Sequence, residues 1–444
     1  MIPEGFVWGA ASSAYQIEGH STADGGGLCI WDTFCHTPGK IANEDNGDIA
    51  CDAYHRFAED LRLLSQTGAT AYRFSTSWAR VDPKGDGNWN EKGVAYYEKV
   101  VDCCLSLGLT PYMTLYHWEL PQAVQDRGGW EAAETAKAFG RYAGIMAKRF
   151  RGKVKHFFTL NEPQCTVQLG YAQGVHAPGL CLDTAGQFAV LKSQLLAHGY
   201  AQKAILAEIP DAIVGVASTG RLCYPQTETP ENIAAAGQAT FEASDDDWRF
   251  THSMVLDPVV LGRFPDCGAG ELTELISRVT DEEMSIIHTV PHMLGYNIYN
   301  GNAVRAGANG PEYPARYPGF PRTALKWPVE PEVLDWGLRL LQERYGLPGY
   351  ITENGLSCND KIYLDGKVHD LDRIDFLERY LRAMERAIDH GADIRGYFHW
   401  SLTDNLEWHS GYCDRFGLVY IDFRDLRRIP KDSYYWFKER IGGK

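Results

Sequence analysis

Two short segments decide the fold, HFFTLNEP at residues 156–163 and GYITENG at residues 349–355. Each contains a run of apolar and β-branched residues, which predicts a buried strand. Each predicted strand ends on a glutamate, Glu162 in the first and Glu353 in the second, with an asparagine beside it. One carboxylate at a strand end has an ordinary structural explanation. Two of them beside amides indicate a shared site.

Six further apolar runs predict strands that begin at Phe6, Thr70, Thr110, Ala212, Met293 and Ile394. Between most of the strands lie amphipathic helical patterns, among them residues 52–67, 135–150 and 376–388. Eight strands alternating with helices predict an α/β fold, a closed (β/α)8 TIM barrel with extended βα loops. We expect it to form one catalytic domain over residues 1–444. The alternative is a doubly wound open sheet, but its Gly-rich phosphate turn after an early strand is missing.

The composition excludes several classes of partner. The formal net charge of −15 disfavours nucleic acid and anionic membrane surfaces. No stretch approaches the ~18 apolar residues of a membrane span, and the first residues lack the pattern of a signal peptide. The 11 cysteines show no CxxC spacing, and an odd count fits a disulfide framework poorly. We therefore expect a cytoplasmic protein with a small-molecule partner, either a monomer or a homo-oligomer.

The sequence gives little support for a metal or a cofactor. It contains no HExxH motif, its histidines are scattered, and Asp245–Asp247 is better explained as a helix cap than as a calcium loop. The glycine run at residues 25–27 lacks the Lys-Ser/Thr of a phosphate-binding P-loop. We predict neither a metal nor a cofactor.

The two glutamates fit the hydrolysis of glycosidic bonds. In that reaction one carboxyl protonates the leaving oxygen while the other attacks the sugar. Sugar-binding residue types surround both glutamates in sequence, and aromatic residues make up 12% of the chain. An aromatic plane can stack on the C–H face of a sugar ring, although this aromatic content is also typical of a large core.

Eight motifs resemble those of glycoside hydrolase family 1, the family of retaining β-glucosidases. They are FVWGAASSAYQIEG (6–19), GDIACDAYHRFAED (47–60), YRFSTSWAR (72–80), LYHWELP (115–121), TLNEP (159–163), HAPG (176–179), ITENG (351–355) and DNLEWHSGYCDRFGLVYIDF (404–423). The resemblance covers essentially the whole chain. It implies hydrolysis of terminal non-reducing β-D-glucosyl residues by double displacement. Glu119, Leu406 and Ala11 depart from the family's usual Asp, Phe and Thr, outside the expected catalytic roles.

The resemblance implies that Glu162 is the general acid/base and Glu353 the nucleophile. Glu162 must start protonated, and the nearby charge of Glu353 raises its pKa in that direction. Glu353 must stay ionised, and Arg73 is expected to hold it so through a charge-assisted hydrogen bond, with Tyr299 as a second donor. A retaining mechanism needs the two carboxyls about 5–5.5 Å apart. The alternative is a pair of glutamates that form purely structural ion pairs with basic residues.

Four polar residues are expected to bind the sugar. By resemblance, Gln16 and Glu407 take the hydroxyls at C3, C4 and C6, and His117 takes the C3 hydroxyl. Asn161 takes the C2 hydroxyl, a contact that strengthens in the transition state. Amides, an imidazole and a carboxylate suit sugar hydroxyls because each hydroxyl both donates and accepts.

Aromatic residues complete the predicted binding site. The resemblance implies that Trp400 stacks on the sugar ring and that Trp408 bonds the C3 or C4 hydroxyl. Trp327 corresponds to a tryptophan at the entrance to the aglycone site. The remaining predicted substrate-binding residues are Trp118, Asn297 and Phe416.

Several related functions compete with a β-glucosidase. A 6-phospho-β-glycosidase needs a cationic pocket where this chain has Glu407 and Trp408, which would repel the phosphate and fill its space. Thioglucosidases typically lack the acid glutamate, and an inactive sugar-binding relative is expected to lose one carboxylate, whereas both are here. β-Galactosidase or β-fucosidase side activity and transfer to an acceptor sugar or alcohol stay open. So does the preferred aglycone, whether a cello-oligosaccharide or an aryl or alkyl group.

Overall fold

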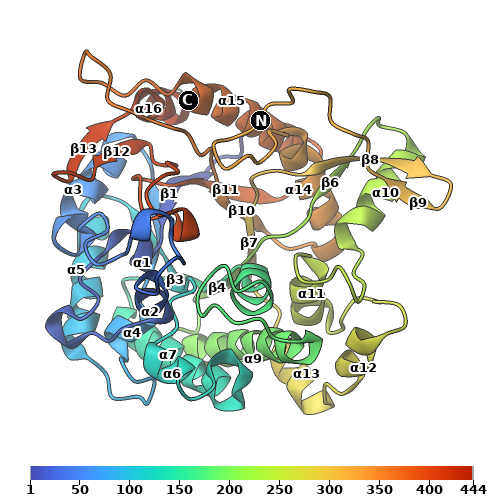
Figure 1. Ribbon diagram of the computed structural model, residues 1–444, viewed down its shortest axis with the longest axis horizontal. Coiled ribbons are helices and arrows are strands. Elements are labelled where there is room, and N and C mark those ends of the chain that lie inside the picture. The colour runs from blue at the N-terminus through green and yellow to red at the C-terminus, as the bar shows by residue number, and fades with distance from the viewer. Residues whose placement is uncertain (1, 443–444) are drawn as a thin grey trace.

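The computed structural model describes residues 2–442 and contains a closed barrel of eight parallel strands (Figure 1). Around the barrel the order is β1, β11, β10, β7, β5, β4, β3 and β2. Their bounds are β1 (Val7–Ser12), β2 (Ala71–Ser75), β3 (Thr110–Tyr116), β4 (His156–Asn161), β5 (Ile213–Ser218), β7 (Met293–Asn297), β10 (Gly349–Asn354) and β11 (Ile394–Trp400). All eight predicted strands and the predicted (β/α)8 barrel are confirmed.

Long helices surround the barrel (Figure 1). They are α3 (Ala53–Gln66), α5 (Glu91–Ser106), α7 (Ala133–Phe150), α9 (Thr184–Glu208), α14 (Glu332–Tyr345) and α15 (Leu371–Asp389). Three of them match the predicted helical patterns, but α15 begins five residues earlier than its apolar pattern. Its first turn is held by charge, because the buried Arg373 pairs with Asp360 and Asp370. Among residues 2–442 no helix is long and apolar enough to cross a membrane.

Shorter elements fill the loops that follow the strands. The helices are α1 (Ala14–Ile17), α2 (Ile30–Cys35), α4 (Trp78–Val81), α6 (Gln122–Gln125), α8 (Pro163–Cys165), α10 (Pro230–Phe241), α11 (Ser253–Leu256), α12 (Glu271–Ser277), α13 (Asp281–Ile287) and α16 (Asp432–Gly442). The strands are β6 (Cys223–Pro225), β8 (Asn302–Gly307), β9 (Gly310–Glu312), β12 (Val419–Asp422) and β13 (Arg427–Pro430).

The inside of the barrel changes character along its axis. One cluster of buried residues from the barrel strands fills it with aromatic and small side chains, namely Ala11, Ala71, Tyr112, Phe158, Ala217, Met293, Tyr350, Phe398 and Trp400. Towards the carboxyl ends of the strands, buried polar residues take over, including Arg73, Asn161, Asn297 and Glu353. The apolar layers hold the barrel together, and the polar end is where a (β/α)8 enzyme builds its site.

Both glutamates lie at the carboxyl ends of their strands, with a small correction to the prediction. Glu162 follows the last residue of β4 and precedes α8, and its φ of 47° is left-handed. Glu353 is the penultimate residue of β10, where the pairing with β7 shifts register between Ile351 and Glu353. Neither glutamate is therefore the final strand residue. A left-handed backbone at Glu162 cannot continue the strand, which ends at Asn161.

Candidate active site

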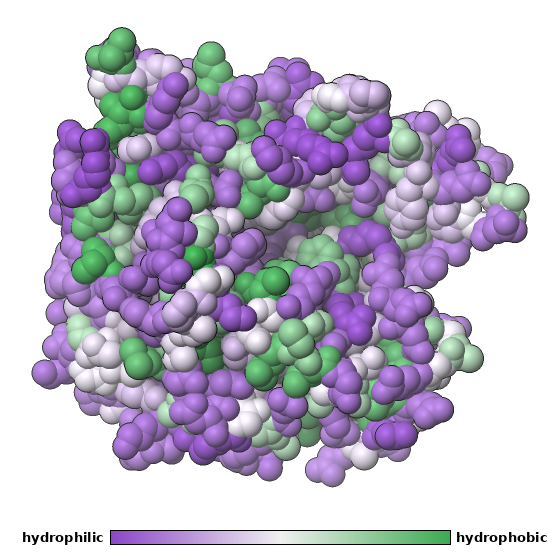
Figure 2. Space-filling view, in the orientation of Figure 1, coloured by the Kyte–Doolittle hydropathy of each residue, from purple (hydrophilic) through white to green (hydrophobic). Residues whose placement is uncertain are grey.

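The predicted catalytic residues come together at the carboxyl ends of the barrel strands. The face of the molecule drawn in Figure 2 is hollowed near its centre. Glu162 and Glu353 are 5% and 3% exposed, and both are linked to the same amide, that of Asn297. Asn297 and Glu353 come from the adjacent strands β7 and β10, and Glu162 follows β4, which β5 separates from β7. The two carboxyl groups thus share one buried site at the same end of the barrel.

Glu353 is held by a cation and a phenol. Arg73 Nη1 donates to Glu353 Oε1 at 2.7 Å, and the hydroxyl of Tyr299 donates to Oε2 at 2.7 Å. Arg73 Nη1 also donates to the backbone carbonyl of Thr352 at 3.1 Å, so the guanidinium is anchored on β10. Both contacts that were predicted for Glu353 are present. Each oxygen of this carboxylate accepts a hydrogen bond, which favours its charged form.

The amide of Asn297 hydrogen-bonds Glu162 and lies beside Glu353. Its Nδ2 donates to Glu162 Oε1 at 2.6 Å and to Asn161 Oδ1 at 3.0 Å. The hydroxyl of Thr352 donates to Asn297 Oδ1 at 2.6 Å. An amide oxygen accepts and its nitrogen donates, so this last bond directs the Asn297 Nδ2 towards Glu162.

Asn161 is oriented in the same way. Its Oδ1 accepts from Arg73 Nη2 at 2.6 Å, and its Nδ2 lies 3.1 Å from His117 Nε2. The indole of Trp118 donates to the Asn161 backbone carbonyl at 3.0 Å. Burial and the charge of Arg73 lower the pKa of His117 well below its usual value. The imidazole is therefore neutral, accepts at Nε2 and carries its proton on Nδ1.

The electrostatics distinguish the two carboxyls. Burial raises the pKa of Glu162 to about 8, and the charge of Glu353 adds to that rise. Burial also raises the pKa of Glu353, but the charge of Arg73 and hydrogen bonds from Arg73, Tyr299 and Asn297 oppose it. The pair therefore holds one proton near neutral pH. That proton lies on Glu162, because the guanidinium pairs with Glu353.

Gln16 lies against the loop that carries Glu407. Its Nε2 donates to the carbonyl of Leu406 at 2.7 Å and to Asn405 Oδ1 at 3.1 Å, while Ser13 donates to its Oε1 at 2.5 Å. Both N–H groups of the amide are thus engaged by the protein, and the oxygen keeps one lone pair. The structure thus bonds Gln16 to Leu406, the residue before Glu407. Gln16, His117, Asn161 and Glu407 are the four predicted sugar-binding residues, called the sugar clamp below.

Glu407 has a carboxyl with a buried oxygen that lacks a hydrogen-bond donor among the described residues. Within residues 2–442 its Oε2 is buried and accepts no hydrogen bond. Burial raises the pKa of Glu407 well above its usual value, and the charges of Asp414, Glu353 and Glu162 add to the effect. A buried carboxyl oxygen without a donor is costly. It is suited to a ligand that brings its own hydroxyl.

Aromatic rings form the walls of the site. The imidazole of His117 stacks on Trp400 with ring centroids 5.5 Å apart, and Trp408 packs against Trp31 and Trp118 at 4.3 and 4.7 Å. Trp327, Tyr299 and Phe416 form a second group, with Tyr299 5.3 Å from Trp327 and 6.0 Å from Phe416. The second group includes Tyr299, which bonds Glu353, so the predicted entrance residue Trp327 lies near one of the two glutamates.

Thr352 is the residue that sequence reasoning missed. It fixes the Asn297 amide from its place in β10, one residue before Glu353. Thr352 lies in the ITENG motif, but the alternation of side chains along a strand predicts only which face of the strand Thr352 occupies. Its partner comes from another strand, so the hydrogen bond is visible only once the barrel is closed. Among residues 2–442 one histidine and aspartate cluster could hold a metal, and it shares no residue with this site.

A comparison with protein families decides the family of the chain. The model of glycosyl hydrolase family 1 matches residues 1–444. The chain belongs to glycosyl hydrolase family 1. The resemblance inferred from the eight sequence motifs is thereby confirmed.

Relatives and solved structures in glycosyl hydrolase family 1 cover nearly the full chain. The 1,4-beta-D-glucan glucohydrolase of Thermotoga neapolitana is 39% identical over 449 residues, 99% of this chain and 98% of the relative. The bifunctional beta-D-glucosidase/beta-D-fucosidase of Bifidobacterium breve is 39% identical, over 99% and 98% of the two chains. The beta-glucosidase from Thermotoga maritima in complex with glucoimidazole has a TM-score of 0.89 at 38% identity, with 99% and 98% covered.

Proposed function

We propose that this chain is a retaining β-glucosidase in which Glu162 is the general acid/base and Glu353 is the nucleophile. The observation that carries the assignment is the contrast between two buried carboxyls that lie beside the amide of Asn297. Glu353 is paired with Arg73, whereas Glu162 has a pKa raised to about 8. One group is thus ready to attack and the other to protonate. The family and the full-length β-glucosidase relatives support the same function.

The first chemical step forms a covalent intermediate. A carboxylate oxygen of Glu353 attacks C1 of the sugar and forms an ester bond while the bond from C1 to the glycosidic oxygen breaks. Glu162 gives its proton to that oxygen, so the aglycone leaves as a neutral alcohol. The positive charge of Arg73 and the hydroxyl of Tyr299 keep Glu353 ionised and oriented before the attack.

The second step returns the enzyme to its starting state. Glu162, now ionised, accepts a proton from water, and the resulting hydroxide oxygen attacks C1 from the face that the aglycone left. The ester bond to Glu353 breaks and releases the carboxylate. An acceptor sugar or alcohol can replace the water, so transglycosylation uses the same intermediate. Two inversions at C1 give net retention of the β configuration.

The substrate that the site fits is an unphosphorylated terminal β-glucosyl residue on a cello-oligosaccharide or an aryl or alkyl group. Glu407 and Asp414 place two carboxyls where a phosphate would need cations, and Trp408 is buried in the same loop. The names of two relatives, a glucan glucohydrolase and a bifunctional glucosidase/fucosidase, support oligosaccharide substrates with fucoside hydrolysis as a side activity. Asn161, Gln16 and His117 complete the proposed sugar clamp.

The proposal also covers the domain organisation of the chain and its cellular compartment. We propose that residues 1–444 act as one catalytic domain, since the family model spans all of them. All 11 cysteines are free thiols, 7 of them buried, which fits a reducing cytoplasm better than an oxidising compartment.

The experiment that tests the substrate is a rate comparison across matched glycosides. The expected order of kcat/KM places p-nitrophenyl β-glucoside far above its 6-phosphate, with p-nitrophenyl β-fucoside below or near the glucoside. Cellobiose hydrolysis, followed by glucose release, extends the test to a natural leaving group. Preference for the 6-phosphorylated compound would overturn the substrate assignment, and loss of the β configuration in the first-formed sugar would overturn the retaining mechanism.

A further inference from the structure

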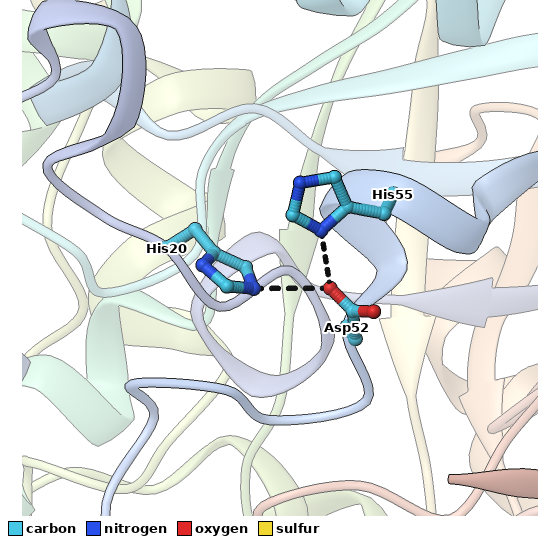
Figure 3. Close-up of side chains that lie close together, drawn as sticks. All are labelled: His20, Asp52 and His55. Carbon is cyan, nitrogen blue, oxygen red and sulfur yellow. Dashed lines mark hydrogen bonds and ion pairs between the residues drawn. The ribbon is translucent and has the colours of Figure 1, made fainter.

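A second group of chemically active side chains lies in the loop that connects β1 to β2. His20, Asp52 and His55 come from two separate sequence segments and meet at one point, with both imidazoles directed at the aspartate (Figure 3). His20 Nε2 lies 3.0 Å and His55 Nδ1 2.6 Å from the same oxygen, Asp52 Oδ1. All three ligand atoms lie within 4.8 Å of one another.

We propose that His20, Asp52 and His55 form a binding site for a divalent late first-row transition metal, best represented by Zn²⁺. Two imidazoles and a carboxylate are a ligand set that such ions accept, with water in the remaining position. Two ligands of a tetrahedral zinc ion lie roughly 3.3 Å apart, because each metal–ligand bond is about 2.0–2.1 Å. The three atoms therefore reach a metal geometry through small side-chain rotations.

The backbone on both sides of the cluster is already fixed. The amide of His20 donates to the carbonyl of Asp48 at 2.8 Å, and the His20 carbonyl accepts from Arg80 Nη1 at 3.2 Å. Asp52 precedes the first turn of α3, and its amide donates to the carbonyl of Ile49 at 2.7 Å. The ligands are thus held in place before any ion arrives, which reduces the entropy lost on binding.

The side chains of the cluster are accessible to solvent, and two of its three residues have a left-handed backbone conformation. The side chains of His20, Asp52 and His55 are 29%, 19% and 57% exposed, so an ion can reach them from solvent. His20 and Asp52 have φ values of 52° and 54°, a region that residues other than glycine rarely adopt. Such conformations cost free energy and are concentrated at functional sites.

Metal binding requires only a change of tautomer at the two imidazoles. When neutral His20 and His55 donate to Asp52, each carries its proton on the nitrogen that faces the carboxylate. The metal takes the lone pair of that nitrogen, and the proton is carried instead by the other ring nitrogen. Three coordinate bonds to the metal then replace the two hydrogen bonds. They connect His20 to Asp52 and His55 at the start of α3.

His369, elsewhere in the chain, contacts carboxylates without forming a cluster in which three ligand atoms meet at one point. His369 also contacts two carboxylates, with Nδ1 2.6 Å from Asp432 Oδ2 and Nε2 3.0 Å from Asp365 Oδ2. Its two nitrogens point in different directions, so the two carboxylates do not meet at one point. Its side chain is 36% exposed, between the values for His20 and His55. It provides a matched control for the loss of an imidazole that pairs with aspartate.

The test is a Co²⁺ titration of the full chain at pH 7.5, followed by visible absorption. Cobalt reports its ligands, because nitrogen and oxygen ligands give weak visible bands whereas cysteine thiolates add strong charge-transfer bands in the near ultraviolet. We expect one equivalent to bind without the thiolate bands. H20A and D52N weaken binding at least tenfold, while H369A binds like the parent chain. Circular dichroism of each variant establishes that it is folded.

Thermal unfolding supplies the second measurement. Zn²⁺ at a hundredfold excess over its dissociation constant is expected to raise the unfolding midpoint of the parent chain and of H369A by about 3 °C. The same zinc concentration raises the midpoint of folded H20A by at most about half as much, because its binding is at least tenfold weaker. Three results would overturn the proposal. They are stoichiometric binding that persists in H20A, thiolate bands in the cobalt complex, and an absence of binding at metal concentrations up to about 100 µM.

Discussion

The catalytic pair and the sugar clamp differ in how completely the protein satisfies their polar atoms. Around the pair, both oxygens of Glu353 and one of Glu162 accept hydrogen bonds from the protein. In the clamp, His117 Nδ1 and Glu407 Oε2 are buried, and neither has a hydrogen-bond partner within residues 2–442. The protein therefore satisfies both oxygens of Glu353 and one of Glu162, and leaves one polar atom each on His117 and Glu407 for the substrate to complete.

The difference has an energetic consequence. Preorganised donors around the catalytic carboxyls stabilise charge without reorganisation during the reaction. Unpartnered atoms in the clamp cost folding free energy, roughly 1–3 kcal/mol each, and that cost is relieved when sugar hydroxyls bind. Substitutions in the two regions should therefore affect rate and stability differently. The variants below test that difference, from the largest expected effect to the smallest.

Loss of the nucleophile should have the largest effect. Glu353→Ala removes the group that forms the ester, so turnover of every glucoside should fall on the order of 10⁶-fold, as for other enzymes that lose a covalent nucleophile. Azide can occupy the vacated space and attack C1 directly, which gives α-glucosyl azide by a single inversion. Nuclear magnetic resonance of the product measures the outcome. A β-glucosyl azide product would contradict the assignment of Glu353.

Loss of the acid/base should depend on the leaving group. Glu162→Ala should reduce kcat/KM on the order of 10²–10⁴-fold for alkyl glucosides and cellobiose, which need protonation. The reduction should be much smaller for dinitrophenyl β-glucoside, whose leaving group departs without a proton. Azide should restore turnover of that substrate and give β-glucosyl azide through the intact ester. Equal losses on good and poor leaving groups, with no azide effect, would show that Glu162 has another role.

The clamp should separate activity from stability. Glu407→Ala should lower kcat/KM for glucosides about ten- to a hundredfold, because the hydroxyls at C4 and C6 lose their acceptor. The same change removes an unpartnered buried carboxyl, so the free energy of unfolding should rise by about 1–3 kcal/mol at pH 7.

The pH dependence of that gain has a definite sign. Folding raises the pKa of Glu407, so its destabilising effect is small below the unfolded pKa and grows as the pH rises towards the folded pKa. Denaturant unfolding at pH 4 and pH 7 measures the gain, which should be larger at pH 7. Glu407→Gln is the matched variant, since it keeps the shape and loses the charge. A lower stability of both variants would contradict the comparison between the two regions.

The sequence predicted the barrel and its strands because each strand is a short apolar run between helical patterns. It also predicted the pairing of Glu353 with Arg73 and Tyr299, since Glu353 and Arg73 lie in recognisable motifs and Tyr299 ends the apolar run that begins at Met293. It did not predict Thr352 as the partner of Asn297, because that bond joins two strands and depends on barrel register. The cluster of His20 with Asp52 and His55 was likewise hidden, because His20 is 32 residues from Asp52 and approaches it only in the folded chain.

Thr352 allows the mildest test of the satisfied region. Thr352→Val keeps the volume of this fully buried side chain but removes the donor that orients Asn297. Without it the amide can rotate, and the hydrogen bond from Asn297 to Glu162 is weakened. Loss of one such bond is worth about 1 kcal/mol, so kcat/KM should fall roughly fivefold.

The same variant should move the pH profile in a known direction. Glu162 must be protonated to act as an acid, so kcat/KM of the parent chain should fall as the pH rises through about 8. The Asn297 N–H group stabilises ionised Glu162 and lowers its pKa, so weakening this bond should shift the basic limb of Thr352→Val to higher pH. Thr352→Ser retains the hydroxyl and should keep the parent profile. A basic limb that stays in place, or moves to lower pH, in Thr352→Val would mean that the Asn297 amide does not set the protonation of Glu162.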